Sequence, residues 1–316
     1  MALTLCVIGA SGFLGSHVVA QALAKGHKVR AVMRNPDDVT KTSWLMKLYK
    51  AEGNLTFHAG DLDQLGSFDE AIKGSEAVVV CAFPETPSEP KLIETVRGGA
   101  LHILKSCTDH GVKTIVLTSS GGSTNPKEGE PPVKNEMDHW SDPDYQISQG
   151  KYSPAAKTLM DQAALQYGKD HPELRVVVLN PNLIMGPMFQ PDLPAKGSLN
   201  MLLSILKRER LDKIPNGSMS IIDVRDLAAL ELAAVENPHA AGRYFGVLRS
   251  FHWKEIMEAI HEVHPEFEVP PVGYEGDDVR PTQFDHSRKE SLGVKLRDLK
   301  TILHDAINDL KARKLL

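Results

Sequence analysis

Three glycines recur at every third residue near the start of the chain: Gly9, Gly12 and Gly15. The apolar run 3–8 precedes them and an amphipathic pattern over 16–26 follows, which predicts a strand, a glycine turn and a helix. In such a turn Gly9 permits a sharp bend, Gly12 lets a phosphate approach, and Gly15 lets the helix pack close to the strand. The phosphates of a dinucleotide would lie on free N–H groups at the positive end of the helix.

The spacing G-x-x-G-x-x-G differs from the usual G-x-G-x-x-G, and a tight turn alone also selects glycine. Its position after a buried type of strand favours a dinucleotide site. The residues predicted to bind the pyrophosphate are Gly9, Ser11, Gly12, Phe13, Leu14 and Gly15.

Basic residues follow the second predicted strand, residues 28–33. A carboxylate at this strand end would bind the ribose hydroxyl of NAD and repel the extra phosphate of NADP. The chain instead has Arg34, with Lys41 seven residues further on. A guanidinium group suits phosphate, so we predict NADP(H) as the cofactor; the competing explanation is two ordinary solvated cations.

Strand and helix patterns alternate along the first 180 residues. Strands are expected at 54–62, 77–84, 114–118 and 175–179, and helices at 67–74, 93–110 and from Ser153-Pro154 onward. This alternation predicts an α/β fold, a Rossmann-type doubly wound parallel sheet with a smaller C-terminal substrate-binding region. We expect residues 1–182 to form the NADP-binding domain, with 219–241 returning to it, and residues 183–218 and 242–316 to form the substrate-binding region.

The segment after the strand 114–118 lies where α/β sheets bind ligands. The polar stretch 124–149 is too long for a plain connection and is predicted to cover the active site. Ser153 is predicted to cap the next helix, with Pro154 in its first turn.

Composition excludes several classes of function. The net charge of −5 and the pI near 6.2 argue against nucleic acid or an anionic membrane as the main partner. No apolar stretch reaches the ~20 residues of a membrane span. Cys6, Cys81 and Cys107 lie in apolar stretches, which is typical of reduced thiols in a cytoplasmic protein. The 13 histidines show no ligand spacing, so no metal is expected.

With these residues in view, the chain resembles the extended short-chain dehydrogenase/reductases, in particular the dihydroflavonol 4-reductase and cinnamoyl-CoA reductase-like branch, over nearly its whole length. The segments that carry the resemblance are residues 9–15, Arg34 with Lys41, Asp61-Leu62, 67–74, 118–120, 140–142, 157–164, Asn180-Pro181, 186–187, 284–285 and 292–293.

The resemblance implies hydride transfer from NADPH to a carbonyl, with a small-molecule aldehyde, ketone or acyl-CoA-like substrate. In this family a tyrosine supplies the proton, a lysine lowers the tyrosine's pKa and holds the nicotinamide ribose, and a serine orients the substrate oxygen. The positions implied here are Tyr152, Lys157 and Ser120. Asp61 and Leu62 are implied to hold the adenine, and Ala82 and Pro181 also to contact the cofactor.

The tyrosine spacing departs from the family pattern by one residue. Family members have tyrosine and lysine four apart, which places both on one side of a helix. Here Ser153 stands four residues before Lys157, and Tyr152 stands five before it. Three explanations are open: the helix begins at Ser153 and leaves Tyr152 free, a π-bulge absorbs the extra residue, or Tyr152 points elsewhere. Tyr145 is a further candidate for the proton donor.

Two other functions therefore remain open. A catalytically silent NADPH-binding sensor or scaffold would explain the displaced tyrosine. An epimerase or dehydratase would retain NAD tightly, which Arg34 disfavours. The substrate cannot be read from the sequence, and a monomer and a homodimer are equally compatible with it. We expect residues 183–220 and the segment after 245 to shape the pocket.

Several side chains have two competing explanations. The apolar side chains of Phe83, Met185, Met188 and Phe189 suit either an apolar pocket or a core between the two regions. Asp223 and Asp226 look like paired catalytic carboxylates, but capping of the following helix is the preferred interpretation.

Overall fold

The computed structural model describes residues 2–84, 90–193 and 197–316. Seven strands form one parallel sheet in the order β3-β2-β1-β4-β5-β6-β9. They are β1 (Thr4–Ile8), β2 (Lys28–Met33), β3 (Leu55–Ala59), β4 (Ala77–Val80), β5 (Thr114–Thr118), β6 (Arg175–Pro181) and β9 (Gly242–Gly246). The strand order reverses between β1 and β4, which is where a sheet of this kind opens a crevice for ligands.

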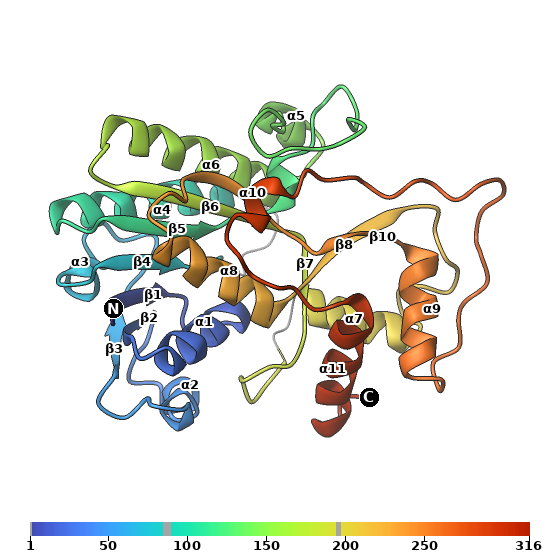
Figure 1. The fold of residues 1–316 in the computed structure, drawn as a ribbon, viewed down its shortest axis with the longest axis horizontal. Coiled ribbons are helices and arrows are strands. Elements are labelled where there is room, and N and C mark those ends of the chain that lie inside the picture. Colours follow the sequence, from blue (N-terminus) through green and yellow to red (C-terminus); the bar gives the residue numbers. More distant parts are fainter. Residues whose placement is uncertain (1, 85–89, 194–196) are drawn as a thin grey trace.

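Helices cover both faces of this sheet (Figure 1). On one face lie α1 (Phe13–Ala24) and α8 (Val224–Glu236); on the other lie α3 (Asp69–Ile72), α4 (Lys91–Asp109) and α6 (Tyr152–Asp170). Leu5 and Val7 of β1 belong to the core beneath α1 and α8, whereas Cys6 and Ile8 belong to the core beneath α4 and α6. This alternation follows from the two-residue period of a strand. The predicted doubly wound sheet is confirmed.

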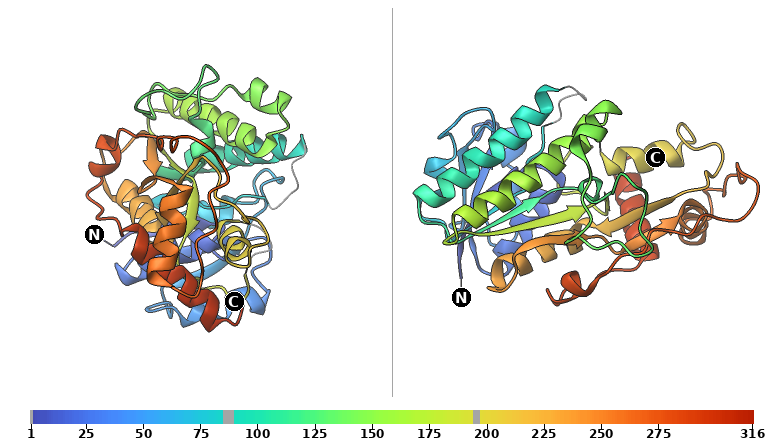
Figure 2. Two further views of the ribbon diagram at one scale, coloured as in Figure 1. Left: turned by 90° about the vertical axis from the view of Figure 1, so that its right-hand side faces the viewer. Right: turned by 90° about the horizontal axis from the view of Figure 1, so that it is seen from above.

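A second, smaller sheet has the order β10-β8-β7. Its strands are β7 (Leu183–Met185), β8 (Ser218–Asp223) and β10 (Arg249–His252), and they pack with α7 (Ser198–Leu206), α9 (Trp253–Val263) and α11 (Leu299–Ala312) around a third core. Figures 1 and 2 show this part of the chain beside one end of the main sheet. The short elements are α2 (Val39–Thr42), η1 (Leu45–Lys47), η2 (Gly121–Ser123), α5 (Pro143–Ser148) and α10 (Ser287–Glu290).

Two strands differ from the expected division of the chain. The strand β9 pairs with β6 and so completes the main sheet, although residues from 242 onward were expected in the substrate-binding region. The strand β8 pairs with β7 and β10, although residues 219–241 were expected to return to the main sheet. The helix α8 does return, because its buried side belongs to the core shared with α1. The division into domains otherwise stays a prediction.

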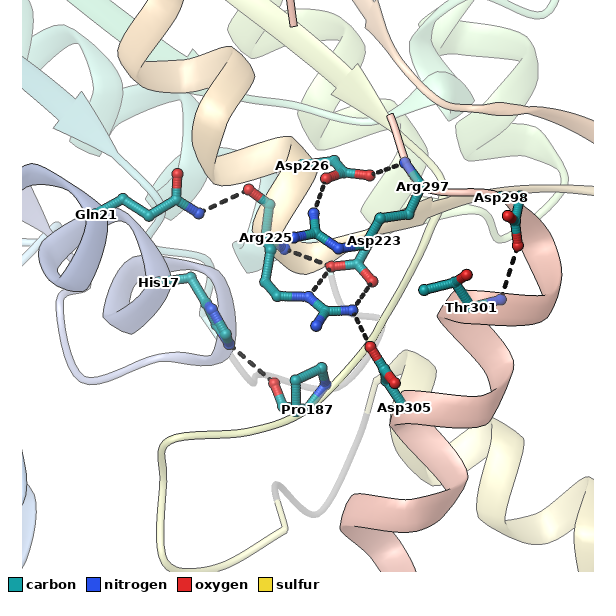
Figure 3. A network of polar contacts seen from close by, with 10 residues as sticks. All are labelled: His17, Gln21, Pro187, Asp223, Arg225, Asp226, Arg297, Asp298, Thr301 and Asp305. Atoms are coloured by element: carbon teal, nitrogen blue, oxygen red, sulfur yellow. Dashed lines mark hydrogen bonds and ion pairs between the residues drawn. The ribbon is translucent and has the colours of Figure 1, made fainter. Parts of the chain in front are cut away.

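A network of ion pairs between side chains joins the start of α8 to the last helix (Figure 3). Asp223 is the N-cap of α8 and accepts a hydrogen bond from the Arg225 N–H at 2.8 Å, so its predicted capping role is confirmed. The Arg225 guanidinium binds both Asp223 and Asp305 of α11 at 2.7 Å. Asp226 does not cap the helix: it lies in the first turn and binds the backbone and side chain of Arg297. Both carboxylates are therefore structural.

Candidate active site

The turn between β1 and α1 has the geometry of a phosphate-binding site. Gly9 has φ +83°, and a Cβ built there would lie 2.7 Å from the backbone nitrogen of Ala82, at the end of β4. A Cβ on Gly15 would lie 2.1 Å from the Gly9 carbonyl oxygen. In the described chain, the backbone N–H groups of Phe13 and Leu14 have no acceptor, as at any open helix start. The turn therefore presents free donors beside the point where the strand order reverses.

Two cations stand close to the end of β2. Arg34 directly follows the strand, and Lys41 lies on α2, whose N-cap Asp38 accepts a hydrogen bond from the Thr40 N–H. Both basic side chains are exposed, and neither has a hydrogen bond or an ion pair within the described residues. Their position fits the expected NADP-phosphate site, and the competing explanation of solvated cations fits equally.

Asp61 and Leu62 follow β3 and are fixed by their neighbours. The Ser67 hydroxyl accepts from the Asp61 N–H and donates to the Asp61 carbonyl, at 3.0 and 2.8 Å. Leu62 packs on α4, where a Cβ on Gly99 would lie 2.7 Å from the Leu62 Cβ. The predicted helix 67–74 forms only the single turn α3, because the preceding residues are used to hold Asp61. The adenine contact stays a prediction.

Ser120 and Lys157 both bind the polypeptide at the carboxyl end of β5. The Ser120 hydroxyl oxygen accepts from the Gly122 N–H at 3.0 Å, and a Cβ on Gly122 would touch both this oxygen and Pro154 of α6. The Lys157 ammonium donates to the Thr118 carbonyl at 2.7 Å and lies 4.6 Å from the centre of the Phe83 ring. Burial lowers the pKa of Lys157 to about 8. The structure thus brings the predicted serine and lysine to one strand end.

The helix α6 begins at Tyr152, and its N-cap is Lys151, so the predicted N-cap at Ser153 is wrong. The bond from the Ala155 N–H to the Lys151 carbonyl, at 3.1 Å, starts the regular pattern. Pro154 is accommodated because the first N–H groups of a helix have no intrahelical acceptor. All of residues 152–170 are α-helical, which also excludes the π-bulge. Tyr152 and Lys157 therefore leave the helix about 140° apart, and Ser153 holds the usual tyrosine position.

Tyr145, the other candidate donor, lies on the short helix α5 and is 42% exposed. The Lys127 ammonium lies 5.3 Å from the centre of its ring. Its neighbour Gln146 donates to the Gly122 carbonyl at 2.7 Å, so α5 is anchored to the segment that carries Ser120.

A buried polar network that the sequence analysis missed supports this segment. The Asp161 carboxylate accepts from the Ser123 hydroxyl at 2.7 Å and from the Asn180 amide at 2.9 Å. The Asn180 amide also donates to the Ser120 carbonyl at 3.1 Å. Arg243 is fully buried beside the Trp140 ring and donates to the Ser123 and His139 carbonyls. These contacts fix the backbone around Ser120 and give Ser123 a structural role.

Glu231 of α8 is a second group that the sequence analysis missed. It is completely buried and accepts a hydrogen bond from the Thr118 hydroxyl at 2.6 Å. Burial raises the pKa of its carboxyl to about 8. Leu230 and Leu232 flank it in sequence, and the one available signal was that it is the single acid in the apolar stretch 227–235 of this helix.

A cavity of about 470 Å³ adjoins the strand ends and has a mixed polar and apolar lining. Asn180 and Asn182 line it from the main sheet, and Ser218 and Ser250 line it from the small sheet. Its remaining walls include parts of the predicted covering segment and of residues 279–284. Gly121, next to Ser120, also lines it, whereas Ser120, Tyr152 and Lys157 do not.

The four residues suggested for an apolar pocket divide into two pairs. Met185 and Met188 are buried in the core of the small sheet, so they serve a core, although it is not a core between the two regions. Phe189 is 41% exposed and packs against His17, and Phe83 covers Lys157. None of the four lines the cavity. Methionine and phenylalanine occur both in apolar pockets and in hydrophobic cores, so the sequence alone could not distinguish the two.

Two kinds of feature are absent from the described residues. No helix among them is long and apolar enough to cross a membrane. No group of three or more histidine, cysteine, aspartate or glutamate side chains within the same ranges is arranged to hold a metal ion.

The seven-stranded parallel sheet, with a glycine turn where its order reverses and a buried lysine at the end of β5, defines an α/β protein of the Rossmann class. The model of the NAD dependent epimerase/dehydratase family matches residues 5–246. The chain therefore belongs to this family.

Two relatives and one solved structure show the resemblance over the whole chain. Dihydroflavonol 4-reductase from Callistephus chinensis is 35% identical over 322 residues, which cover 98% of this chain and 87% of that protein. A cinnamoyl-CoA reductase from Medicago truncatula is 29% identical over 317 residues, 98% and 96% of the two chains. The crystal structure of vestitone reductase from alfalfa has a TM-score of 0.86 at 27% identity, covering 99% of this chain and all of that one. The resemblance to extended short-chain dehydrogenase/reductases is thus confirmed.

Proposed function

We propose that this chain is an NADPH-dependent reductase that acts on the carbonyl group of a small molecule, with Ser120, Tyr152 and Lys157 as its working residues. The observation that carries the proposal is that Ser120 and Lys157 are both anchored to backbone at the end of β5, in the same sheet as the glycine turn. The names of the relatives, which are reductases of dihydroflavonols, cinnamoyl-CoA and vestitone, support the type of reaction.

The residues present fit the cofactor. A Cβ would collide with backbone at Gly9 and Gly15, and the N–H groups that follow are free to bind a pyrophosphate. Arg34 and Lys41 would hold the additional phosphate of NADP. NADPH, when bound, supplies the hydride. Ala82 and Pro181, at the ends of β4 and β6, would border its nicotinamide end.

The chain's own groups would then act on the substrate oxygen. The Ser120 oxygen already accepts the Gly122 N–H, which leaves its hydrogen free to bind that oxygen. The Lys157 ammonium would hold the ribose and stabilise the negative charge that develops on the oxygen. Tyr152, in the first turn of α6, would deliver the proton.

The substrate is proposed only as a class, an aldehyde, ketone or acyl-CoA-like compound. The mixed lining of the cavity supports a molecule that has both an apolar part and hydrogen-bonding groups beside its carbonyl. The three cysteines are free thiols, which supports a cytoplasmic location.

A second candidate function is a silent NADPH-binding sensor or scaffold. The observation that favours it is the regular α6, which places Tyr152 and Lys157 about 140° apart. A reductase without a placed proton donor would bind NADPH and turn over slowly.

The test is NADPH oxidation against a panel of aldehydes, ketones and acyl-CoA esters, with Tyr152→Phe and Ser153→Ala beside the parent. We expect turnover in the parent and a loss of about 100-fold or more in Tyr152→Phe, the size of a lost general acid. Ser153→Ala is the matched control and should retain activity. Unchanged turnover in Tyr152→Phe would remove Tyr152 from the mechanism. NADPH binding without turnover would support the silent binder, and absence of NADPH binding would contradict both.

A further inference from the structure

The end of β5 joins two charged groups that come from opposite faces of the sheet. Lys157 lies on α6 and its ammonium donates to the Thr118 carbonyl at 2.7 Å. Glu231 lies on α8, across the sheet, and accepts from the Thr118 hydroxyl at 2.6 Å. One threonine therefore binds the lysine with its backbone and the glutamate with its side chain.

The carboxyl of Glu231 is only half satisfied. Its Oε1 accepts from Thr118, whereas no described residue hydrogen-bonds to its Oε2, which is also shielded from solvent. Burying a carboxyl without partners is costly, and opposite charge nearby is the usual compensation. Within the described chain, the titratable groups that act on Lys157 are, from the largest effect to the smallest, Asp161 on its own helix, Cys81 after β4, and Glu231.

We propose that Glu231 is a positioning residue that fixes the Lys157 ammonium through Thr118 and supplies the counter-charge that keeps it protonated. The inference rests on the proposed function only in that Lys157 is the group that contacts cofactor and substrate. Glu231 itself touches neither in this arrangement and acts through the other two residues.

The Glu231 charge raises the pH at which Lys157 loses its proton, because opposite charges stabilise each other. Burial disfavours the charged form of both groups and brings both pKa values to about 8, while each charge favours the other. As the pH rises, Glu231 can give up a proton and leave the lysine charged. Without this carboxyl, Lys157 would have to lose its own proton at a lower pH.

The variant Glu231→Gln tests this directly, because glutamine keeps the shape and the acceptor for Thr118 and removes the charge. Thr118→Val removes the hydroxyl and keeps the backbone carbonyl. Glu236→Gln is the matched control: it changes an acid on the same helix that pairs with Lys25, at 2.7 Å, away from β5. The first readout is the pH titration of the Lys157 side chain by NMR with ¹³C-labelled lysine, assigned with Lys157→Met. The second is the pH profile of kcat with NADPH.

We expect Glu231→Gln to lower the midpoint of the Lys157 titration by about 1 unit, the size of effect an opposite charge has at close range. The alkaline fall of kcat should move to lower pH by the same amount. Thr118→Val should shift both in the same direction by less, and Glu236→Gln should shift neither.

An unchanged Lys157 titration in Glu231→Gln would overturn the proposal, whatever the rate does. A lower rate at every pH with an unmoved profile would also contradict it, since that is what a purely structural role predicts. If no substrate is reduced, the proposed function fails, yet the NMR titration still decides the role of Glu231. If Glu231→Gln does not fold, the titration of Thr118→Val decides, and a parent-like midpoint there overturns the proposal.

Discussion

The turn after β1 and the end of β5 lie in the same sheet, but they are built in different ways. The turn is made by seven consecutive residues, 9–15, and it acts through backbone N–H groups and the absence of side chains at Gly9 and Gly15. The end of β5 is made by Ser120, Lys157 and Glu231, which come from three distant segments, and it acts through side chains.

The two regions therefore differ in how strongly a one-residue shift in sequence affects them. A local backbone turn is correct as soon as the glycines stand at the right spacing, whereas a site built from several helices depends on the rotation of each. On α6 one residue of offset turns a side chain by about 100°. The displaced tyrosine matters for this reason, and nothing comparable affects the turn. The comparison predicts that substitutions in the turn act mainly on stability and binding, and those at β5 on activity.

The largest effect is expected from Gly15→Ala. The new Cβ would lie 2.1 Å from the backbone oxygen of Gly9, and a backbone atom can be relieved only by moving the turn. We expect the free energy of unfolding to fall by about 2–4 kcal/mol and NADPH binding to be lost. Urea denaturation and NADPH fluorescence titration measure the two effects.

The control for Gly15→Ala is Gly98→Ala, on α4, where no atom lies within 4 Å of the new Cβ. It should be neutral or stabilise by up to about 1 kcal/mol, as alanine does inside a helix. Equal stability of the two variants would contradict this prediction, because it would show that the turn can shift to accommodate the new Cβ at little cost.

The same contrast explains what could be predicted from the sequence. The sheet, the turn and the approximate strand bounds follow from local apolar runs and glycines, and Asp223 as a cap follows from its place before α8. The N-cap of α6 was misplaced by two residues, because Ser153-Pro154 is a typical helix start, whereas the actual N-cap is Lys151 and the first helical residue is Tyr152.

Contacts between distant elements could not be predicted in this way. Glu231 meets Thr118 across 113 residues of sequence, and Asn180 meets Ser120 across 60. The acid within an apolar stretch marks Glu231 as unusual, but no local pattern shows which residue it or Asn180 contacts. Their role is defined by packing of α8 and β6 against β5, which depends on the whole sheet.

A smaller effect on stability and a large one on activity are expected from Lys157→Met. Methionine fills similar space and removes a buried charge, but it leaves the Thr118 carbonyl and the buried Glu231 carboxyl without the lysine, so we expect a loss of stability at pH 7 that is smaller than that of Gly15→Ala. Turnover should fall by about 100-fold or more, since the positive charge beside the substrate oxygen is lost. Lys169→Met, in the exposed last turn of the same helix, is the control.

Stability against pH gives Lys157→Met a second readout. Because burial lowers the pKa of Lys157 to about 8, the unfolded chain binds more protons than the folded chain between about pH 8 and 10. The parent should therefore gain stability over this range relative to the variant. A Lys157→Met variant that is as unstable as Gly15→Ala at pH 7 and as active as the parent would reverse the contrast between the two regions.

The smallest effect is expected at the edge of the cofactor site, from Arg34→Gln. This side chain is exposed and has no partner in the described chain, so its removal should not change the free energy of unfolding by more than about 0.5 kcal/mol. If it binds the additional phosphate of NADP, its loss should raise the NADPH dissociation constant by about tenfold or more, the size of a charged hydrogen bond, and leave that of NADH unchanged. Lys47→Gln, an exposed lysine on η1, should change neither constant. Equal weakening of NADPH and NADH binding would mean that Arg34 contacts a part common to both cofactors. Unchanged binding of both would mean that Arg34 is an ordinary solvated cation. In either case the preference for NADPH would have to come from Lys41 or from another residue, since the turn 9–15 binds the part that both cofactors share.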